Sequence, residues 1–143
     1  MGGAMHMHVE INYLAVVVAA MVYYGGGALW YSPVFLADPW VKAAGLDPEK
    51  LKAGKNNAWR SYLVALIAAL FISYGLARVE AYMQVSDFAG GLHTGFWSWL
   101  CYVVTTMAMN YSFENRSWKL LLINAGYHLY GFIVMAVILA VWK

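Results

Sequence analysis

His128 and Asn124 form the most suggestive pair of polar side chains in the sequence. In a helix, His128 lies one turn after Asn124 and about one turn before Gly131, so the three residues share a face. A neutral imidazole at this place could bind a metal cofactor or a solute, or relay a proton near neutral pH. Alternatively, Asn124 and His128 hydrogen-bond to neighbouring helices and hold them in register. We favour this structural interpretation.

Other residues of the same apolar surroundings could complete a polar pocket near the middle of a membrane. Its predicted lining is Asn124, His128, Tyr127, Thr105 and His93. At about 1.5 Å per helical residue, His93 and His128 are offset by roughly 12 Å along the membrane normal. Two ligands of one iron lie only about 4 Å apart. We therefore predict no shared metal and no cofactor.

The familiar sequence patterns of enzymes are missing. The chain has no G-x-S-x-G, no H-E-x-x-H and no P-loop. Its single cysteine, Cys101, excludes an intrachain disulfide, and its apolar neighbours predict a small buried residue. His6 and His8 form an H-x-H pair that is expected to lie free. We predict a protein that is not an enzyme and has no catalytic residues.

The overall composition indicates that lipid surrounds the chain. Of 143 residues, 63% are hydrophobic and 11% are charged, against roughly 45–50% and 25% in an ordinary soluble domain. The length suits one domain, residues 1–143. A formal net charge of +2 is too small to argue for a nucleic-acid partner.

Four charge-poor stretches are long enough to cross a bilayer as helices, which takes about 20 apolar residues each. They are residues 12–32, 60–79, 88–110 and 119–142. Without water, the backbone must satisfy its hydrogen bonds within each segment, so helices are expected rather than strands. The predicted fold is an all-α integral membrane four-helix antiparallel bundle. We expect it to bury no Asp, Glu, Lys or Arg.

The segment between the first two stretches carries signals for two short helices. Asp38 and Asp47 each precede a Pro, and Gly45 and Gly54 follow them seven residues later. An N-cap Asp, a Pro at the first helical position and a left-handed Gly at the end are typical helix boundaries. These helices are predicted to lie at the membrane interface, with their lysines toward water and anionic lipid.

The distribution of positive charge predicts the orientation, because cytoplasmic loops carry more Lys and Arg. One side has only Arg78 and Lys143. Both termini, which lie on that side, should therefore face away from the cytoplasm in a multi-pass protein of the cell inner (plasma) membrane. The seven residues of the cytoplasmic side are Lys42, Lys50, Lys52, Lys55, Arg60, Arg116 and Lys119.

Small residues recur in every predicted helix, as close helix association in lipid requires. In the second stretch they repeat every four residues, and the third contains a G-x-x-x-G. The residues predicted to pack helix against helix are Gly27, Ala65, Ala69, Ser73, Gly91, Gly95 and Gly131, with Ala77 extending the repeat of the second stretch.

Aromatic residues are numerous, with 7 Trp and 11 Tyr. Those near the ends of the stretches are typical of a membrane interface, whereas deeper ones need a polar partner or a pocket. A Tyr-Ser pair recurs at 31–32 and 111–112, at equivalent depth in the first and third stretches, which hints at a duplicated hairpin. The deeper aromatic residues are Trp97, Trp99, Tyr127 and Tyr130.

Three groups of residues carry a family resemblance. They are Asn12-Tyr13-Leu14-Ala15, Gly27-Ala28-Leu29-Trp30-Tyr31-Ser32-Pro33, and Trp118-Lys119-Leu120 running into Ile123-Asn124-Ala125-Gly126-Tyr127-His128-Leu129. On these residues the chain resembles a widespread family of small bacterial four-span membrane proteins catalogued as a domain of unknown function, over nearly its whole length. The resemblance implies a four-helix membrane protein and supplies no activity or catalytic residues.

These features lead to one leading functional expectation and two alternatives. We expect a non-enzymatic protein of the lipid bilayer that acts through helix association, as a homo-oligomer or as an accessory subunit of a larger membrane complex. The first alternative is a small-solute transporter or channel with a polar midplane pocket around Asn124 and His128. The second is a haem or pigment carrier. No nucleic-acid partner is expected.

Overall fold

The computed structural model describes residues 9–54 and 58–143. Within these ranges every regular element is a helix and no strand occurs, which confirms the predicted all-α class. His6 and His8, predicted to form a free H-x-H pair, lie outside the described residues, as does Lys55.

Within residues 9–54 and 58–143, three helices are long and apolar enough to cross a membrane. Side chains cap the start of two of them: the Asn12 carboxamide accepts from the Ala15 N–H at 3.1 Å, and the Ser117 hydroxyl accepts from the Lys119 N–H at 3.2 Å. The helix of the second stretch continues to Tyr82, three residues beyond its predicted end. The three helices are α1 (Tyr13–Trp30), α4 (Ala58–Tyr82) and α7 (Trp118–Val141).

The predicted stretch 88–110 is helical but is not one uniform α-helix. The Asp87 carboxylate caps its start by accepting from the Gly90 N–H at 2.6 Å. The helix then passes through a π-helical turn and continues to Phe113. It is therefore interrupted where a single α-helix was predicted, and it ends three residues after the predicted end at residue 110. Its segments are α5 (Phe88–Ser98), the π-helical turn η2 (Trp99–Val104) and α6 (Thr105–Phe113).

One residue of the π-helical turn, Cys101, is exposed although the sequence predicts it to be buried. The Thr105 hydroxyl donates to the Cys101 carbonyl, four residues earlier, at 2.6 Å, and such bonds bend or loosen a helix. Cys101 is exposed, so the prediction of a buried cysteine is wrong. The reason is its direction: Trp99, two residues earlier, donates to the Ala125 carbonyl of α7. Two residues correspond to about half a helical turn, so Cys101 lies on the side away from α7.

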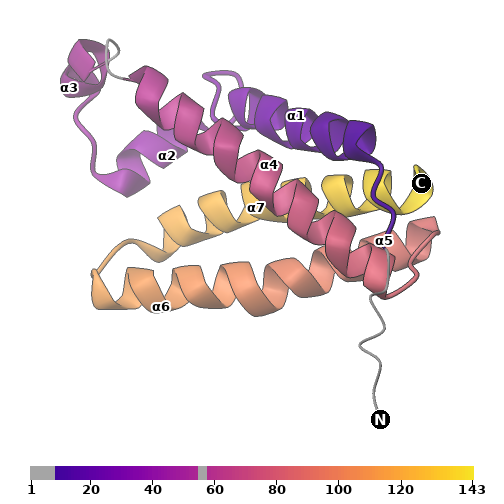
Figure 1. Ribbon diagram of the computed structural model, residues 1–143. Helices are drawn as coiled ribbons and strands as arrows, with labels where there is room; N and C mark the ends of the chain where they lie inside the picture. The colour runs from indigo at the N-terminus through magenta and orange to yellow at the C-terminus, as the bar shows by residue number, and fades with distance from the viewer. Residues whose placement is uncertain (1–8, 55–57) are drawn as a thin grey trace.

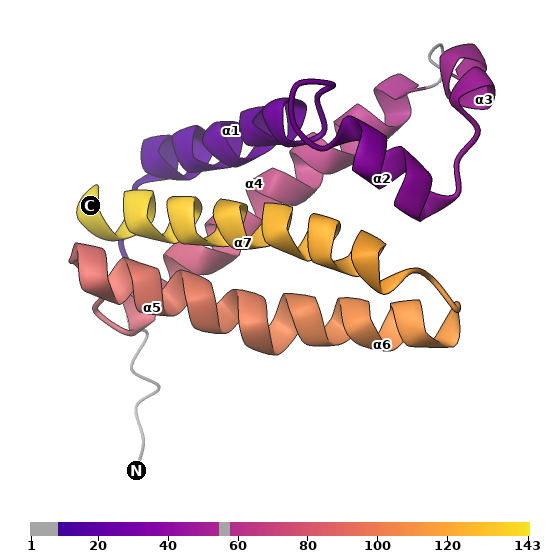
Figure 2. The same cartoon turned by 180° about the vertical axis from the view of Figure 1, so that it is seen from behind.

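α7 lies at the centre of the fold. It packs against α5, α1 and α4, and Figures 1 and 2 show it between α1 and the α5–α6 run, with α4 crossing obliquely. The C-terminus and the turn between α4 and α5 lie at one end of the molecule, here called the terminal end and marked by Glu10, Gln84 and Lys143. The turn between α6 and α7 lies at the other end, the loop end. It contains Glu114, the residue that follows α6.

Small side chains fill the contact between α1, α4 and α7. Ala19, Ala69 and Ala136 are completely buried there. The Ser73 hydroxyl, also buried, donates to the Val16 carbonyl at 2.8 Å and so links α4 to α1. Side chains of this size let helix backbones approach closely.

The small-residue stripe of α4 is only partly covered within one chain. Ala69, Ser73 and Ala77 are buried, whereas Ala65 is exposed. Ala65 borders a cleft that separates α4 from α1 toward the loop end. The stripe therefore packs against other helices from Ala77 to Ala69, and its last member, Ala65, lies on the surface.

The first loop contains the two expected short helices at the loop end. Gly45 ends the first in the left-handed conformation, with φ +65°. Asp47 caps the second by accepting from the Glu49 N–H at 3.0 Å. These helices are α2 (Ala37–Ala44) and α3 (Pro48–Ala53).

Two predicted boundaries of these short helices are wrong. Asp38 lies in the first turn of α2 instead of capping it, because the chain already turns at Leu36, the residue that precedes the helix. Gly54 has φ −80° and is right-handed, because its N–H continues the helical pattern with a bond to the Lys50 carbonyl, four residues earlier.

Candidate functional site

α1 and α7 interlock through glycines that receive aromatic rings from the facing helix. An added Cβ on Gly27 would meet the Tyr127 hydroxyl oxygen at 2.8 Å, and one on Gly126 would meet the Trp30 ring at 3.0 Å. The predicted residues Gly27 and Gly131 therefore both lie in this interface. The full set is Gly26 against Tyr130, Gly27 against Tyr127, Gly126 against Trp30, and Gly131 against Tyr23.

The Asn124 carboxamide joins three parts of the chain. Its Oδ1 accepts from the Tyr31 hydroxyl at 2.7 Å, and its Nδ2 donates to the Tyr111 hydroxyl at 2.8 Å. Tyr31 follows the end of α1 and Tyr111 belongs to α6, so one side chain of α7 bonds to both neighbours. These two tyrosines are the ones that the sequence singled out as members of the repeated Tyr-Ser pair.

His128 is held against α1 by a second set of contacts. Its Nδ1 lies 2.6 Å from the Tyr23 hydroxyl. The Tyr127 hydroxyl donates to the Tyr23 carbonyl at 2.9 Å, and the Tyr23 and Tyr127 rings stack with centroids 4.9 Å apart. Sequence reasoning missed Tyr23 because nothing in the local pattern shows which face of α1 meets α7.

Three further aromatic side chains donate to backbone carbonyls of a facing helix. A carbonyl oxygen in a helix keeps a second lone pair after its own helical bond. The sequence predicted that deep aromatic residues need polar partners. Two of the four that it named, Trp99 and Tyr130, find them in these carbonyls. The bonds run from Trp30 to Ile123 at 3.1 Å, from Trp99 to Ala125 at 2.8 Å and from Tyr130 to Val22 at 3.4 Å.

Two residues of the predicted polar pocket lie away from His128. His93 is exposed on α5 and lines a groove with Asp87 and Val79 that does not include His128. Thr105 is exposed and bonds within its own helix. Gly91 and Gly95 occupy the face of α5 that meets α7, and His93 lies about half a turn from each of them. The structure therefore brings together three of the five predicted pocket residues, those on α7.

Gly91 and Gly95 set the contact between α5 and α7. A Cβ added to Gly91 would meet the Val137 Cα at 2.8 Å, and one added to Gly95 would meet the Phe132 carbonyl oxygen at 2.6 Å. Both obstacles are backbone atoms, which cannot rotate aside. The G-x-x-x-G thus lies directly against the backbone of α7.

Tyr127 also borders the cleft between α1 and the first half of α4. This cleft has a volume of about 490 Å³. Small residues form much of its border, with Gly25 and Ala28 from α1 and Ala65 from α4. Of the five predicted pocket residues, Tyr127 is the one that reaches it.

Among the described residues one carboxylate is buried, which corrects the prediction that no charged side chain would be. Glu80 has no exposed surface. It is buried because α4 continues to Tyr82, which carries Glu80 beside the residues that follow α7. The Lys143 ammonium lies 3.8 Å from its Oε2.

The hydrogen bonds that cross the interface around α7 join neutral groups. Tyr, Trp and Asn donors meet amide, hydroxyl or carbonyl acceptors, and the one imidazole is bonded to a phenol. In the described ranges no group of three His, Cys, Asp or Glu side chains could hold a metal ion. Satisfied networks of this kind specify how helices fit together.

These observations define a class of protein: in the part of the chain that the structure describes, all regular elements are helices and three of them could cross a membrane, joined by neutral hydrogen bonds and glycine–aromatic contacts. The chain belongs to the family described as Protein of unknown function (DUF1761), which matches residues 14–140. The resemblance to a family of unknown function is thereby confirmed. Comparison with curated proteins and with solved structures gave no match.

Proposed function

We propose that this protein crosses the bacterial inner membrane four times and acts by binding a transmembrane helix of a second copy or of a larger membrane complex. It is a non-enzymatic association module in this proposal. The support comes from the length of the third helical run, from the position of the charges and from one uncovered cleft.

The α5–η2–α6 run is the proposed fourth crossing. Its three consecutive segments have 11, 6 and 9 residues, and none of these residues is Asp, Glu, Lys or Arg. The combined length of the three segments exceeds the roughly 20 apolar residues that a crossing takes. With four crossings, the helices form an antiparallel bundle and the termini share one side. Lysines of α2 and α3, together with Arg116 and Lys119, support a cytoplasmic position of the loop end.

The observation that carries the functional proposal is the cleft between α1 and α4. Gly26 and Gly27 each accommodate an aromatic ring, but a Cβ on Gly25 would meet no atom within 4 Å. Gly25 therefore has no steric role within one chain. With Ala28 and Ala65 it places small residues in a cleft that tyrosines also border, among them Tyr24 and Tyr62. Small residues are what another helix packs against closely in lipid.

The hydrogen bonds of α7 favour association over solute transport. A solute site at the midplane needs polar groups that are free to bind the solute. Asn124 instead bonds to Tyr31 and Tyr111, and His128 bonds to Tyr23. The cleft of about 490 Å³ includes neither Asn124 nor His128.

A pair of glycine substitutions tests the proposal. Gly25→Leu places a bulky side chain in the cleft, and Gly75→Leu is its matched control, because Gly75 is equally open but does not border the cleft. Both variants should fold, and Gly25→Leu alone should reduce the assembled mass measured in mild detergent or in native membrane complexes. A strictly monomeric wild-type particle found outside any complex, or an unchanged assembly in Gly25→Leu, would contradict the proposal.

The contact can also be mapped directly. In a Cys101→Ser background, Ala65→Cys should cross-link the chain to its partner across the cleft, whereas Ile67→Cys, about 200° away around α4, should not. Equal cross-linking at both positions would argue against the cleft as the binding surface.

A further inference from the structure

Glu80 is a buried carboxylate whose oxygen atoms lack hydrogen-bond donors. Its side chain has no exposed surface, and no donor among the described residues bonds to Oε1 or Oε2. An unmade hydrogen bond to a buried charged group is costly. Buried polar atoms in native proteins almost always have a partner from the protein, from water or from a bound group. The two oxygens of Glu80 therefore call for a donor.

Lys143 forms an ion pair with Glu80 but does not donate a hydrogen bond to its carboxylate. Its Nζ lies 3.8 Å from Oε2, which is within ion-pair range but beyond the 2.7–2.9 Å typical of a charged hydrogen bond. The Lys143 side chain is 46% exposed and follows the end of α7 at Val141. The site thus already faces an ammonium group, held loosely by a residue outside the helix.

Glu80 lines a groove at the terminal end that is formed by two adjoining hollows. The first has a volume of about 530 Å³ and is bordered by Glu80, Gln84 and Ser86. The second has a volume of about 350 Å³ and is bordered by Asn12 and Trp142. The residues common to both hollows are Glu10, Ala81 and Lys143. We call the two together the terminal groove.

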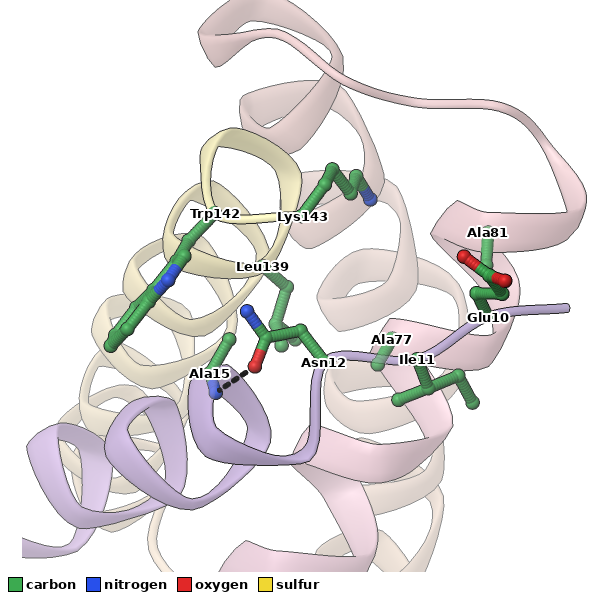
Figure 3. Close-up of a pocket in the computed structure, with 9 residues that line it drawn as sticks. All are labelled: Glu10, Ile11, Asn12, Ala15, Ala77, Ala81, Leu139, Trp142 and Lys143. Atoms are coloured by element: carbon green, nitrogen blue, oxygen red, sulfur yellow. Dashed lines mark hydrogen bonds between the residues drawn. The ribbon is translucent and has the colours of Figure 1, made fainter.

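The smaller hollow shows the chemistry of the groove walls. In Figure 3 the Trp142 ring and the Lys143 side chain come from the end of α7, while Glu10 lies beside Ala81 of α4. The remaining wall includes the apolar Leu139. The larger hollow, which Glu80 borders, adds the polar residues Gln84 and Ser86. Among the described residues no third carboxylate, His or Cys joins the acidic groups of the groove, so the groove suits an organic cation better than a bare metal ion, which hard oxygen ligands would have to surround.

We propose that the terminal groove binds a primary ammonium group, which donates N–H bonds to the Glu80 carboxylate, with Glu10 as the second acidic partner and Lys143 displaced toward solvent. Glu10 and Glu80 are two carboxylates beside one lysine, so the groove carries a net negative charge that attracts a cation. The requirement for N–H donors distinguishes this ligand from a quaternary ammonium, which has none. This inference does not depend on the helix association proposed above.

A primary ammonium at this place has two sources, the headgroup of phosphatidylethanolamine and a soluble amine. The full chain, purified in mild detergent, is titrated with phosphatidylethanolamine, with phosphatidylcholine and with free ethanolamine, and bound ligand is counted by native mass spectrometry. Phosphatidylethanolamine should bind at least tenfold more tightly than phosphatidylcholine, about the value of one charged hydrogen bond. Binding of free ethanolamine with no preference between the lipids assigns the site to a soluble amine.

Three variants test the residues. Glu80→Gln should weaken binding of the primary amine by roughly tenfold or more. Lys143→Met should strengthen it, because the competing ammonium is removed. Glu114→Gln is the matched control: Glu114 lies in an exposed ion pair at the loop end, 3.6 Å from Arg116, and its loss should leave binding unchanged.

The outcome is decisive even if Glu80→Gln fails to fold, because Lys143→Met and Glu10→Gln make opposite predictions. Lys143→Met should bind the amine more tightly and Glu10→Gln more weakly than the wild type. The proposal is overturned if Lys143→Met binds no better than the wild type, or if neither phosphatidylethanolamine nor ethanolamine binds. Equal binding of phosphatidylcholine and phosphatidylethanolamine, without any binding of free ethanolamine, also overturns it.

Discussion

Gly95 and Gly75 offer a matched pair of substitutions that separates helix packing from helix propensity. Alanine at either position gains up to about 1 kcal/mol of helix propensity over glycine. At Gly75 the new Cβ meets nothing within 4 Å, whereas at Gly95 it would lie 2.6 Å from the Phe132 carbonyl oxygen. Reaching an ordinary contact of about 3.4 Å would require α5 and α7 to separate by roughly 0.8 Å, and overpacking of this kind costs about 1–3 kcal/mol.

The difference in unfolding free energy between the two variants isolates this clash. Gly75→Ala should be as stable as the wild type or slightly more stable, and Gly95→Ala should be about 1–3 kcal/mol less stable than Gly75→Ala. Both are measured by denaturant titration of the purified protein in the same detergent, followed by circular dichroism. If Gly95→Ala equals or exceeds Gly75→Ala in stability, the backbone contact between α5 and α7 does not exist in solution.

Three further outcomes follow from individual contacts. A double-mutant cycle of Asn124→Leu with Tyr31→Phe should give a coupling of about 0.6 kcal/mol, in the range of interhelical hydrogen bonds in membranes, and additive effects would contradict the bond at 2.7 Å. Ser73→Ala removes the bond to the Val16 carbonyl and should lower the unfolding free energy by about 0.5–1.5 kcal/mol; an unchanged denaturation midpoint would argue against it. Cys101, exposed on the outer face of η2, should react in membranes with a lipid-soluble maleimide and not with a charged one, and fast labelling by the charged reagent would place it in water.

The course of the helices was predictable because the apolar stretches and their caps are local signals. Asp47 and Gly45 behave as their positions in the sequence indicate. The π-helical turn was not predictable, since it involves a hydroxyl bond from Thr105 in a stretch whose apolar pattern is uninterrupted. Glu80 was not predicted to be buried, because its burial depends on how far α4 continues and on the position of Lys143, which is distant in sequence.

The candidate site was predictable on α7 but not on its partners. The helical spacing of Asn124 and His128 indicates one face with polar side chains, and the structure shows both bonded across helices. Their partners depend on how α1 is rotated about its axis, and the apolar sequence around Tyr23 carries no signal for that rotation. Tyr31 stood out in the sequence through the Tyr-Ser pair that it begins and that recurs at 111–112. Its hydrogen bond to Asn124 depends on tertiary contacts, which the sequence does not show.

The most direct test of the account is the sidedness of the two turns that flank the α5–η2–α6 run. In a Cys101→Ser background, Ser86→Cys and Glu114→Cys are labelled with a membrane-impermeant maleimide in right-side-out and inside-out vesicles. Four crossings predict that Ser86→Cys reacts only in right-side-out vesicles and Glu114→Cys only in inside-out vesicles. Labelling of both positions from the same side would mean that this run does not cross the membrane, and the proposed four-helix topology would be contradicted.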